Sequence, residues 1–127
     1  MKEYLFRGKI IDGQGWAYGL LSNVEPDFCV IKVKRGFFNG NQNEDLEIEV
    51  YPKTVGQMIA RVKGVGVFEG DFCKFDLRHV DESMPAIKGL KGVAVLNNGI
   101  ATISNYYLQY CINIEIIDNI HDNPKLL

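Results

Sequence analysis

Isoleucine and valine are the commonest apolar residues of this 127-residue chain: 13 and 11 of them stand against 10 leucines and 5 alanines. Stiff β-branched side chains suit the pleated surface of a strand better than the turns of a helix. The 13 glycines supply the conformations that tight turns need. The sequence therefore predicts a mainly β protein with little helix.

Short apolar runs separated by turn residues indicate where the strands lie. Runs 5–11 and 16–24 flank Asp12-Gly13-Gln14-Gly15, which is typical of a hairpin turn. The segment 79–89 is polar and is expected to be a loop, and 105–111 does not alternate cleanly, so a helical turn there stays open. Further strands are expected at 28–34, 46–50, 62–68, 72–77, 93–96, 100–103 and 112–116.

Pro52 marks a seam between two halves of the chain. Because proline cannot donate to a β ladder, it ends the preceding strand. Thr54 is placed to cap a short helical turn over residues 55–58. We therefore expect an N-terminal β lobe of residues 1–57 and a C-terminal lobe of residues 58–127.

Length, charge and cysteine pattern limit the class of protein. A chain of this size buries about two thirds of its unfolded surface, so a hydrophobic core can hold the fold without disulfides or metal. A net charge of −2 gives no overall attraction for nucleic acid or anionic lipid. Three separated cysteines within apolar runs are expected to be reduced core residues. No apolar run approaches the ~20 residues of a membrane helix, so we expect a cytoplasmic protein without membrane contact.

Catalytic chemistry finds little support in the sequence. His79, Asp81 and Ser83 have the composition of a nucleophilic triad, but at alternate positions of one segment they favour a solvated loop. His79 and His121 are the two histidines, and no histidine or cysteine recurs at the spacing of metal ligands. We therefore expect no enzyme activity, no cofactor and no metal.

Glu69 and Asp71 form a second candidate pair, because two carboxylates on one face of an extended segment perturb each other's pKa. The structural interpretation is a turn, in which Gly70 takes a conformation that only glycine tolerates and Asp71 bonds to backbone amides. We favour the turn.

The candidate binding patch combines Lys32, Lys34 and Arg35 with Phe37 and Phe38. Aromatic rings beside cations are suited to stacking on the bases of a nucleic acid. The favoured interpretation is a strand end, with lysine stems along apolar surface and the aromatic rings folded inward. Nucleic acid is therefore an alternative partner.

Four strings spread over nearly the whole chain are similar to motifs of one family. Residues 5–9 (LFRGK) with 16–19 (WAYG) resemble an opening FRGK…W-x-Y-G, and residues 50–57 (VYPKTVGQ) resemble a central V-x-P-x-T-V-G-Q. Residues 68–74 (FEGDFCK) contain an EGD strand motif, and 116–127 (IIDNIHDNPKLL) resemble a closing I-G-N-I-x-x-N-P-x-L-L. In this order the strings resemble the YopX-like proteins of bacteriophages and prophages.

The resemblance implies a phage or prophage origin and a two-part β fold, whose C-terminal lobe is a small Src-homology-3-type barrel. It supplies no catalytic or binding residues. Residues 58–63 depart from the family's usual turn, and residues 34–44 have no counterpart in it.

The residues of these motifs have structural interpretations. Gly56 and Gly70 set the backbone, Trp16 anchors packing, and Gln57 is placed to satisfy buried backbone groups near the seam.

Arg7 is costly to bury without a partner, and we expect its guanidinium to pair with Glu69 or Asp71 across the two lobes.

Taken together, we expect a non-catalytic phage accessory protein that associates with itself or binds a phage or host protein. Exposed strand edges and the loop at Phe37 and Phe38 would carry the contact. Three cations within 32–35 and four carboxylates within 44–49 suit attraction between subunits as well as a solvated surface. A homo-oligomer is therefore expected, and the alternative is a nucleic-acid-binding factor that uses residues 32–38.

Overall fold

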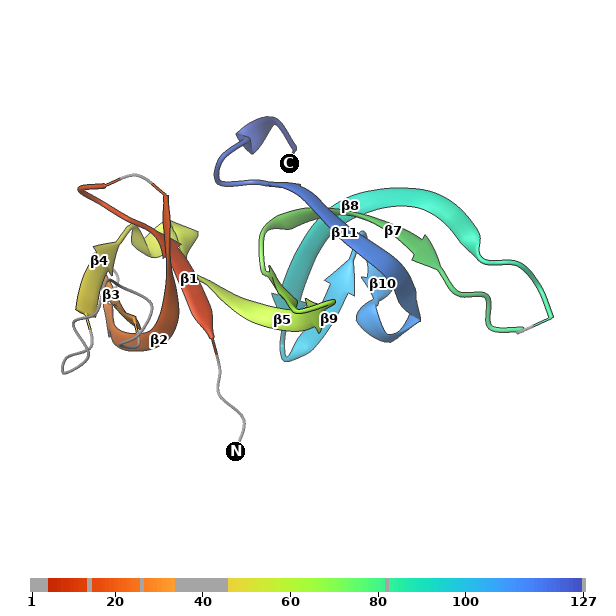
Figure 1. The fold of residues 1–127 in the computed structure, drawn as a ribbon, viewed down its shortest axis with the longest axis horizontal. Helices are drawn as coiled ribbons and strands as arrows, with labels where there is room; N and C mark the ends of the chain where they lie inside the picture. Colours follow the sequence, from red (N-terminus) through yellow and green to blue (C-terminus); the bar gives the residue numbers. More distant parts are fainter. Residues whose placement is uncertain (1–4, 14, 26, 34–45, 82, 127) are drawn as a thin grey trace. The chain divides into compact units, whose positions relative to one another are not determined.

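The chain is mainly β, as the sequence predicts. A computed structural model describes residues 5–13, 15–25, 27–33, 46–81 and 83–126 (Figure 1). Its described residues form 11 strands and three short 3-10 turns. The chain divides into two compact units, Met1–Met58 and Ile59–Leu127.

The N-terminal unit is an antiparallel meander in which each strand pairs with the next. Its strands are β1 (Phe6–Lys9), β2 (Trp16–Glu25), β3 (Phe28–Val33) and β4 (Leu46–Val50). On its other side β1 pairs with the start of β5 (Gly56–Val62), through Phe6 opposite Gln57 and Arg7 opposite Gly56. Its core consists of inward-facing residues of β2, β3 and β4, namely Ala17, Cys29, Ile31, Val33 and Val50.

The C-terminal unit contains a five-stranded antiparallel sheet and the hairpin of β5 with β6 (Val65–Phe68). The sheet has the strand order β10-β9-β8-β7-β11. These strands are β7 (Asp71–Leu77), β8 (Ile87–Asn97), β9 (Ile100–Ile103), β10 (Tyr106–Tyr107) and β11 (Cys111–Asn119). Hairpin and sheet share one core, formed by Val67, Cys73, Phe75, Ala94, Ile103 and Cys111.

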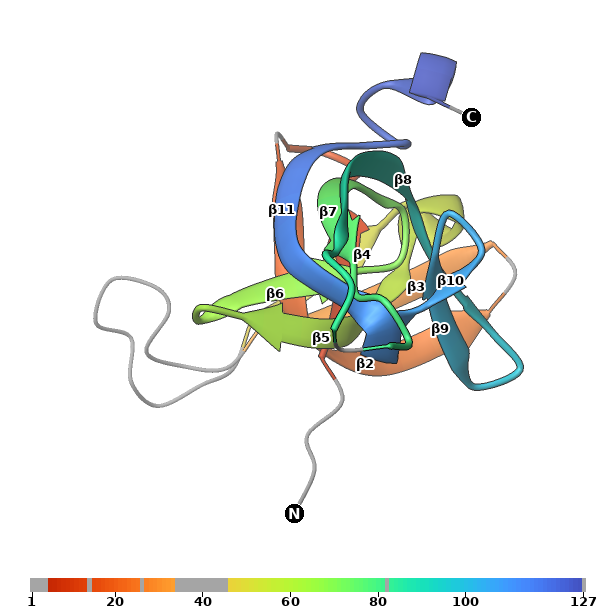
Figure 2. The same ribbon diagram turned by 90° about the vertical axis from the view of Figure 1, so that its right-hand side faces the viewer.

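Both views show β8 and β11 as strongly bent strands (Figures 1 and 2). The register of β7 shifts against β8 between Phe75 and Leu77. It shifts twice against β11, between Ile112 and Glu115 and between Ile116 and Asp118. Extra residues of this kind bend and twist a strand. Among the described residues the sheet nevertheless stays open, with β10 at one edge and β11 at the other.

The helical turn expected over residues 55–58 is wrong. The 3-10 turn lies earlier, at Pro52–Thr54, and Val55 is already extended with φ −68° and ψ 125°. The hydroxyl of Thr54 donates to the carbonyl of Tyr51 at 2.7 Å and accepts the N–H of Lys9 at 2.8 Å. Thr54 therefore ties this turn to β1, and the next residues continue as strand β5.

Other boundaries differ as well. Residues 62–68 form a strand end, a turn at Lys63-Gly64 and then β6 instead of one strand, since both turn residues have positive φ, of 51° and 82°. Strand β8 begins at Ile87, inside the expected loop. Residues 105–111, which do not alternate cleanly, contain β10 (Tyr106–Tyr107) and a 3-10 turn at Leu108–Tyr110. Within the described part of the chain, no helix has the length and apolar character needed to cross a membrane.

Candidate functional site

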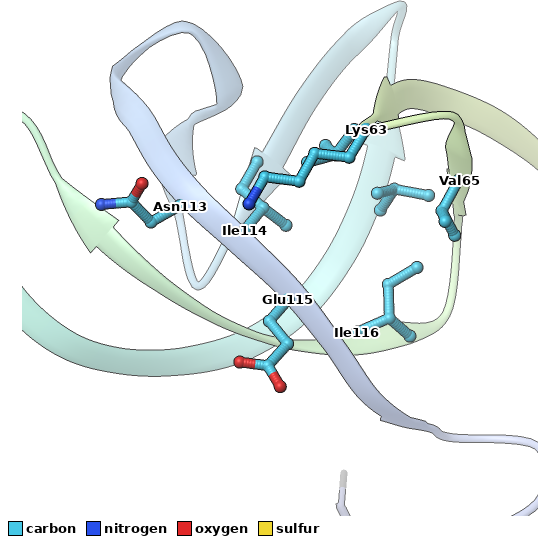
Figure 3. Close-up of a pocket in the computed structure, with 8 residues that line it drawn as sticks. Lys63, Val65, Asn113, Ile114, Glu115 and Ile116 are labelled. Atoms are coloured by element: carbon cyan, nitrogen blue, oxygen red, sulfur yellow. The ribbon is translucent and has the colours of Figure 1, made fainter.

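A groove of about 510 Å³ opens on the C-terminal unit between the β5–β6 hairpin and β11 (Figure 3). We call it the β6–β11 groove; residues 62–67 and 113–116 contribute its lining. Its volume lies within the range of ordinary ligand sites. The groove is mostly apolar, because valines line one wall and isoleucines the other.

The β5–β6 hairpin contributes a buried valine and an exposed lysine to the groove. Val67 is 1% exposed and belongs to the core, whereas Val65 is 58% exposed. Lys63 has a positive φ of 51°, a conformation that costs a residue with a side chain about 1–3 kcal/mol. Figure 3 shows its side chain extending from the turn towards β11. The ammonium group therefore lies over an apolar surface.

The β11 wall is shaped by the first of the two register shifts. Asn113 lies in the shifted stretch and has a φ of 53°, the left-handed region that asparagine tolerates better than most residues. Figure 3 shows Asn113 and Glu115 on one side of β11, and Ile114 and Ile116 on the side of Lys63 and Val65. Both isoleucines also pack against the core.

Asp76, on the neighbouring strand β7, binds this irregular part of β11. Its Oδ2 accepts a hydrogen bond of 2.9 Å from Nδ2 of Asn113, and its Oδ1 accepts the N–H of Gly89 at 3.0 Å. The hydrogen bonds from Asn113 and Gly89, and then the charges of Lys88 and Lys74, lower the pKa of Asp76 despite the opposing effect of burial. One carboxylate therefore links β7 to both of its neighbours where the regular ladders shift.

Both walls of the groove belong to strands at a sheet edge. β6 ends one sheet and β11 ends the other, with no further strand beside them among the described residues. Natural sheets commonly protect such edges with lysine or proline. β6 (VGVF) has no charged residue, and β11 has two, Glu115 and Asp118. The β6 edge is therefore short and uncharged, whereas the β11 edge carries two carboxylates and two register shifts.

Arg7 and Trp16 are brought together in the N-terminal unit. Arg7 is 4% exposed, and its Cζ lies 4.5 Å from the centroid of the Trp16 ring. A cation over an indole face is a stabilising arrangement. The expected pairing with Glu69 or Asp71 joins residues of different units, and it stays a prediction.

The structure places Glu69, Gly70 and Asp71 in a turn. Gly70 has a φ of +91°, and Asp71, 1% exposed, accepts the backbone N–H of Phe68 on Oδ2 at 2.8 Å. A Cβ on Gly70 would lie 3.2 Å from Nε2 of His121. This is the turn that the sequence favours over a catalytic pair of carboxylates.

Of the basic and aromatic patch, Lys32 is described, and Lys34, Arg35, Phe37 and Phe38 lie outside the described residues. Lys32 is directly opposite Glu47 in the β3–β4 register. Opposite charges at such positions attract each other across a sheet. Strand β4 therefore offers Lys32 a neighbour of opposite charge within the chain.

His79, Asp81 and Ser83 form a local turn. Nδ1 of His79 accepts the N–H of Asp81 at 3.0 Å, and Oδ1 of Asp81 accepts the Ser83 N–H at 3.0 Å and its hydroxyl at 2.8 Å. These bonds from Ser83 lower the pKa of Asp81. The hydroxyl donates to the carboxylate instead of the imidazole, so the geometry is that of a loop and not of a nucleophilic triad.

No cluster of three or more histidine, cysteine or acidic residues suited to a metal ion occurs in the described ranges.

Comparisons of the chain with models of known protein families, with curated proteins and with solved structures found no match.

Proposed function

We propose that the protein is a non-catalytic β module, a cytoplasmic accessory protein of a phage or prophage in the YopX-like family, that binds another polypeptide chain through its sheet edges. That polypeptide is a second copy of the chain, a phage protein or a host protein. The family assignment rests on the four strings that resemble YopX-like motifs. In this proposal the C-terminal unit corresponds to the small Src-homology-3-type barrel that the resemblance implies, opened between β6 and β11.

The observation that carries the proposal is the pair of edge strands, β6 and β11, that lie beside one largely apolar groove. A sheet edge offers a row of backbone donors and acceptors, which another strand satisfies by pairing. Val65 and Ile117, on these two strands, are 58% and 44% exposed. Covering them would remove apolar surface from water, which favours association by roughly 25 cal/mol per Å².

The catalytic alternative has weaker support. The Asp71 carboxylate of the 69–71 turn and the three polar residues of the 79–83 loop are engaged in local hydrogen bonds. Neither group is arranged as a nucleophile beside a base. The described residues therefore support a binding role better than an enzymatic one.

Light scattering during size-exclusion chromatography tests the self-association part. We expect the apparent mass to rise above the monomer's 14.3 kDa as concentration increases. Ile117→Lys places a charge on the β11 edge and should return the mass to that of the monomer. Val80→Lys is the matched control, because Val80 lies in a loop and is 89% exposed. A constant monomer mass would remove self-association from the proposal.

Lysine-directed cross-linking in bacterial cells tests the binding of other proteins. We expect discrete cross-linked bands that Ile117→Lys abolishes and Val80→Lys retains. An identical band pattern for the wild type and both variants would show that the sheet edge is not the binding surface. If the chain is also monomeric and forms no cross-links, the proposed function is wrong.

A further inference from the structure

We propose that Asn98 is a site of spontaneous deamidation, at which the side-chain amide is lost as ammonia and an aspartate or an isoaspartate remains. Asn98 and Gly99 form the two-residue turn between β8 and β9. The reaction needs water and no partner protein, so it is independent of the proposed function.

The modification proceeds through a cyclic imide. The backbone nitrogen of Gly99 loses its proton to a base in the solvent and attacks Cγ of Asn98. The new N–Cγ bond closes a five-membered ring, and the Cγ–Nδ2 bond breaks to release ammonia. Water then opens the ring, at Cγ to leave aspartate or at the backbone carbonyl to leave isoaspartate. Water is consumed, ammonia is released and nothing is oxidised, and adjacent reacting groups make the attack intramolecular.

The residue after Asn98 leaves the attacking nitrogen unobstructed. Of the asparagines in the described ranges, Asn98 alone precedes a glycine. A Cβ built on Gly99 would meet nothing within 4 Å, so the surroundings of this nitrogen are open as well. Glycine also turns about its backbone bonds more freely than any other residue. Ring closure is therefore hindered less here than after an asparagine that precedes a side chain.

The side chain of Asn98 is exposed, whereas other asparagines of the C-terminal unit are held by carboxylates. Nδ2 of Asn113 donates to Asp76 at 2.9 Å, and Nδ2 of Asn123 donates to Asp118 at 3.3 Å. No described residue forms such a bond with the amide of Asn98. Its Cγ can therefore turn towards the next backbone nitrogen without breaking a hydrogen bond to the protein.

The backbone of the turn must open locally before the ring closes. Asn98 and Gly99 have φ values of 53° and 80°, those of a type I′ turn. In the left-handed conformation the Gly99 nitrogen lies across the Cα–C bond from Cβ of Asn98, so this bond must rotate first. Asn97 and Ile100 form the last pair of the β8–β9 ladder, and both are exposed. Opening the end of this hairpin therefore breaks few contacts.

The two products differ in what they do to the hairpin. Aspartate is accepted before glycine in this type of turn, so that product adds a negative charge and keeps the turn. Isoaspartate carries the backbone through the side-chain carbon and lengthens the loop by one atom. Because loop length fixes the register of a hairpin, the pairing of Asn97 with Ile100 is then lost.

The test incubates the intact protein at neutral and at mildly alkaline pH and follows the tryptic peptide of residues 92–125 by mass spectrometry. This peptide contains both Asn98 and an internal control, Asn105, which is exposed and has a φ of 69° but precedes tyrosine. We expect Asn98 to gain the mass difference between an amide and an acid at least about tenfold faster than Asn105. The rate should rise with pH, because the attacking nitrogen must lose its proton.

Asn98→Asp supplies the aspartate product directly. This variant should match one aged fraction of the wild type in ion-exchange elution. A second fraction should be a substrate for an isoaspartate methyltransferase and should exchange the amide of Ile100 faster than the variant does.

Three results would overturn the proposal. An unchanged mass at Asn98 would remove the site, and conversion only after unfolding in urea would show that the folded turn prevents the reaction. Equal rates at Asn98 and Asn105 would remove the role of Gly99. Residues 39–40 form another Asn-Gly pair, outside the described residues, and trypsin releases them in a separate peptide, so the two pairs are measured independently.

Discussion

The carboxylate of Asp76 accepts a 2.9 Å hydrogen bond from the side-chain amide of Asn113, a residue 37 positions later in the chain. Through its other oxygen it also accepts the N–H of Gly89. Asp76 therefore links three adjacent strands, β8, β7 and β11. Because Asn113 also lines the β6–β11 groove, one side chain couples the stability of the sheet to the shape of the candidate site.

Asp76→Ala should loosen β11 around the groove. Its loss leaves the Asn113 amide and the Gly89 N–H without this acceptor, and Asn113 loses the contact that holds its left-handed backbone. We expect faster amide exchange over residues 112–116 and 88–90, and a lower Tm. Asp27→Ala, which removes an exposed carboxylate of the other unit, should change neither exchange region. Unchanged exchange in Asp76→Ala would show that the bulge holds its shape without this bond.

Acid should weaken the C-terminal unit through the same group. The folded pKa of Asp76 lies below its ordinary value of 3.8, so the ionised form contributes stability that is present above about pH 4. That contribution is lost as the pH falls from 3.8 through the lower folded pKa. Urea unfolding at pH 6 and at about pH 3 measures it. Asp76→Asn should show a smaller loss between the two pH values than the wild type, and equal losses would contradict the assignment.

Strand positions could be predicted where alternation and turn residues agree. Strands β3, β4, β7 and β9 lie close to the expected runs, because each has a buried face and is bounded by turns. The hairpin turn at Lys63-Gly64 was missed because lysine is not a residue expected at positive φ. The alternation of apolar residues predicts where a strand lies, but it does not predict an unusual backbone angle within it.

The candidate site could not be predicted for a related reason. Residues 112–116 alternate strictly and therefore predict a regular strand, although β11 shifts its register against β7 within them. The partner of Asn113 is set by strand pairing over a long separation, which no local pattern contains. The groove itself needs two edges from separate sheets. The apolar residues of its walls could be predicted from the sequence, but not that the two strands would lie on either side of one groove.

Gly70→Ala should destabilise the protein for two separable reasons. A φ of +91° costs a residue with a Cβ about 1–2 kcal/mol, and the new methyl group would also lie 3.2 Å from the His121 ring. Gly99→Ala is the matched control, since Gly99 has a φ of +80° with nothing within 4 Å of the added carbon. Chemical unfolding should show a larger loss for Gly70→Ala. Equal losses of unfolding free energy for the two variants would mean that the His121 ring moves aside without destabilising the fold.

Arg7→Ala should lower the Tm far more than a typical surface change, because the residue is 4% exposed and stacks on Trp16. The stacking and the lost packing together should be worth more than about 1 kcal/mol. Lys53→Ala, which removes an exposed cation of the same unit, is the control. An unchanged unfolding midpoint in Arg7→Ala would contradict the prediction.

A double-mutant cycle tests the expected pairing of Arg7 with the 69–71 turn. Glu69→Gln removes the charge of one candidate partner while retaining its size, and Asp71→Asn does the same for the other. If Arg7 pairs with one of them, the double variant with Arg7→Ala should be more stable than the sum of the single losses predicts, by about 0.5–3 kcal/mol. Asp71→Asn alone also weakens the bond to the N–H of Phe68, and this separate loss cancels in the cycle. Additive losses with both partners would mean that Arg7 is held by Trp16 and its strand neighbours, with no ion pair to this turn.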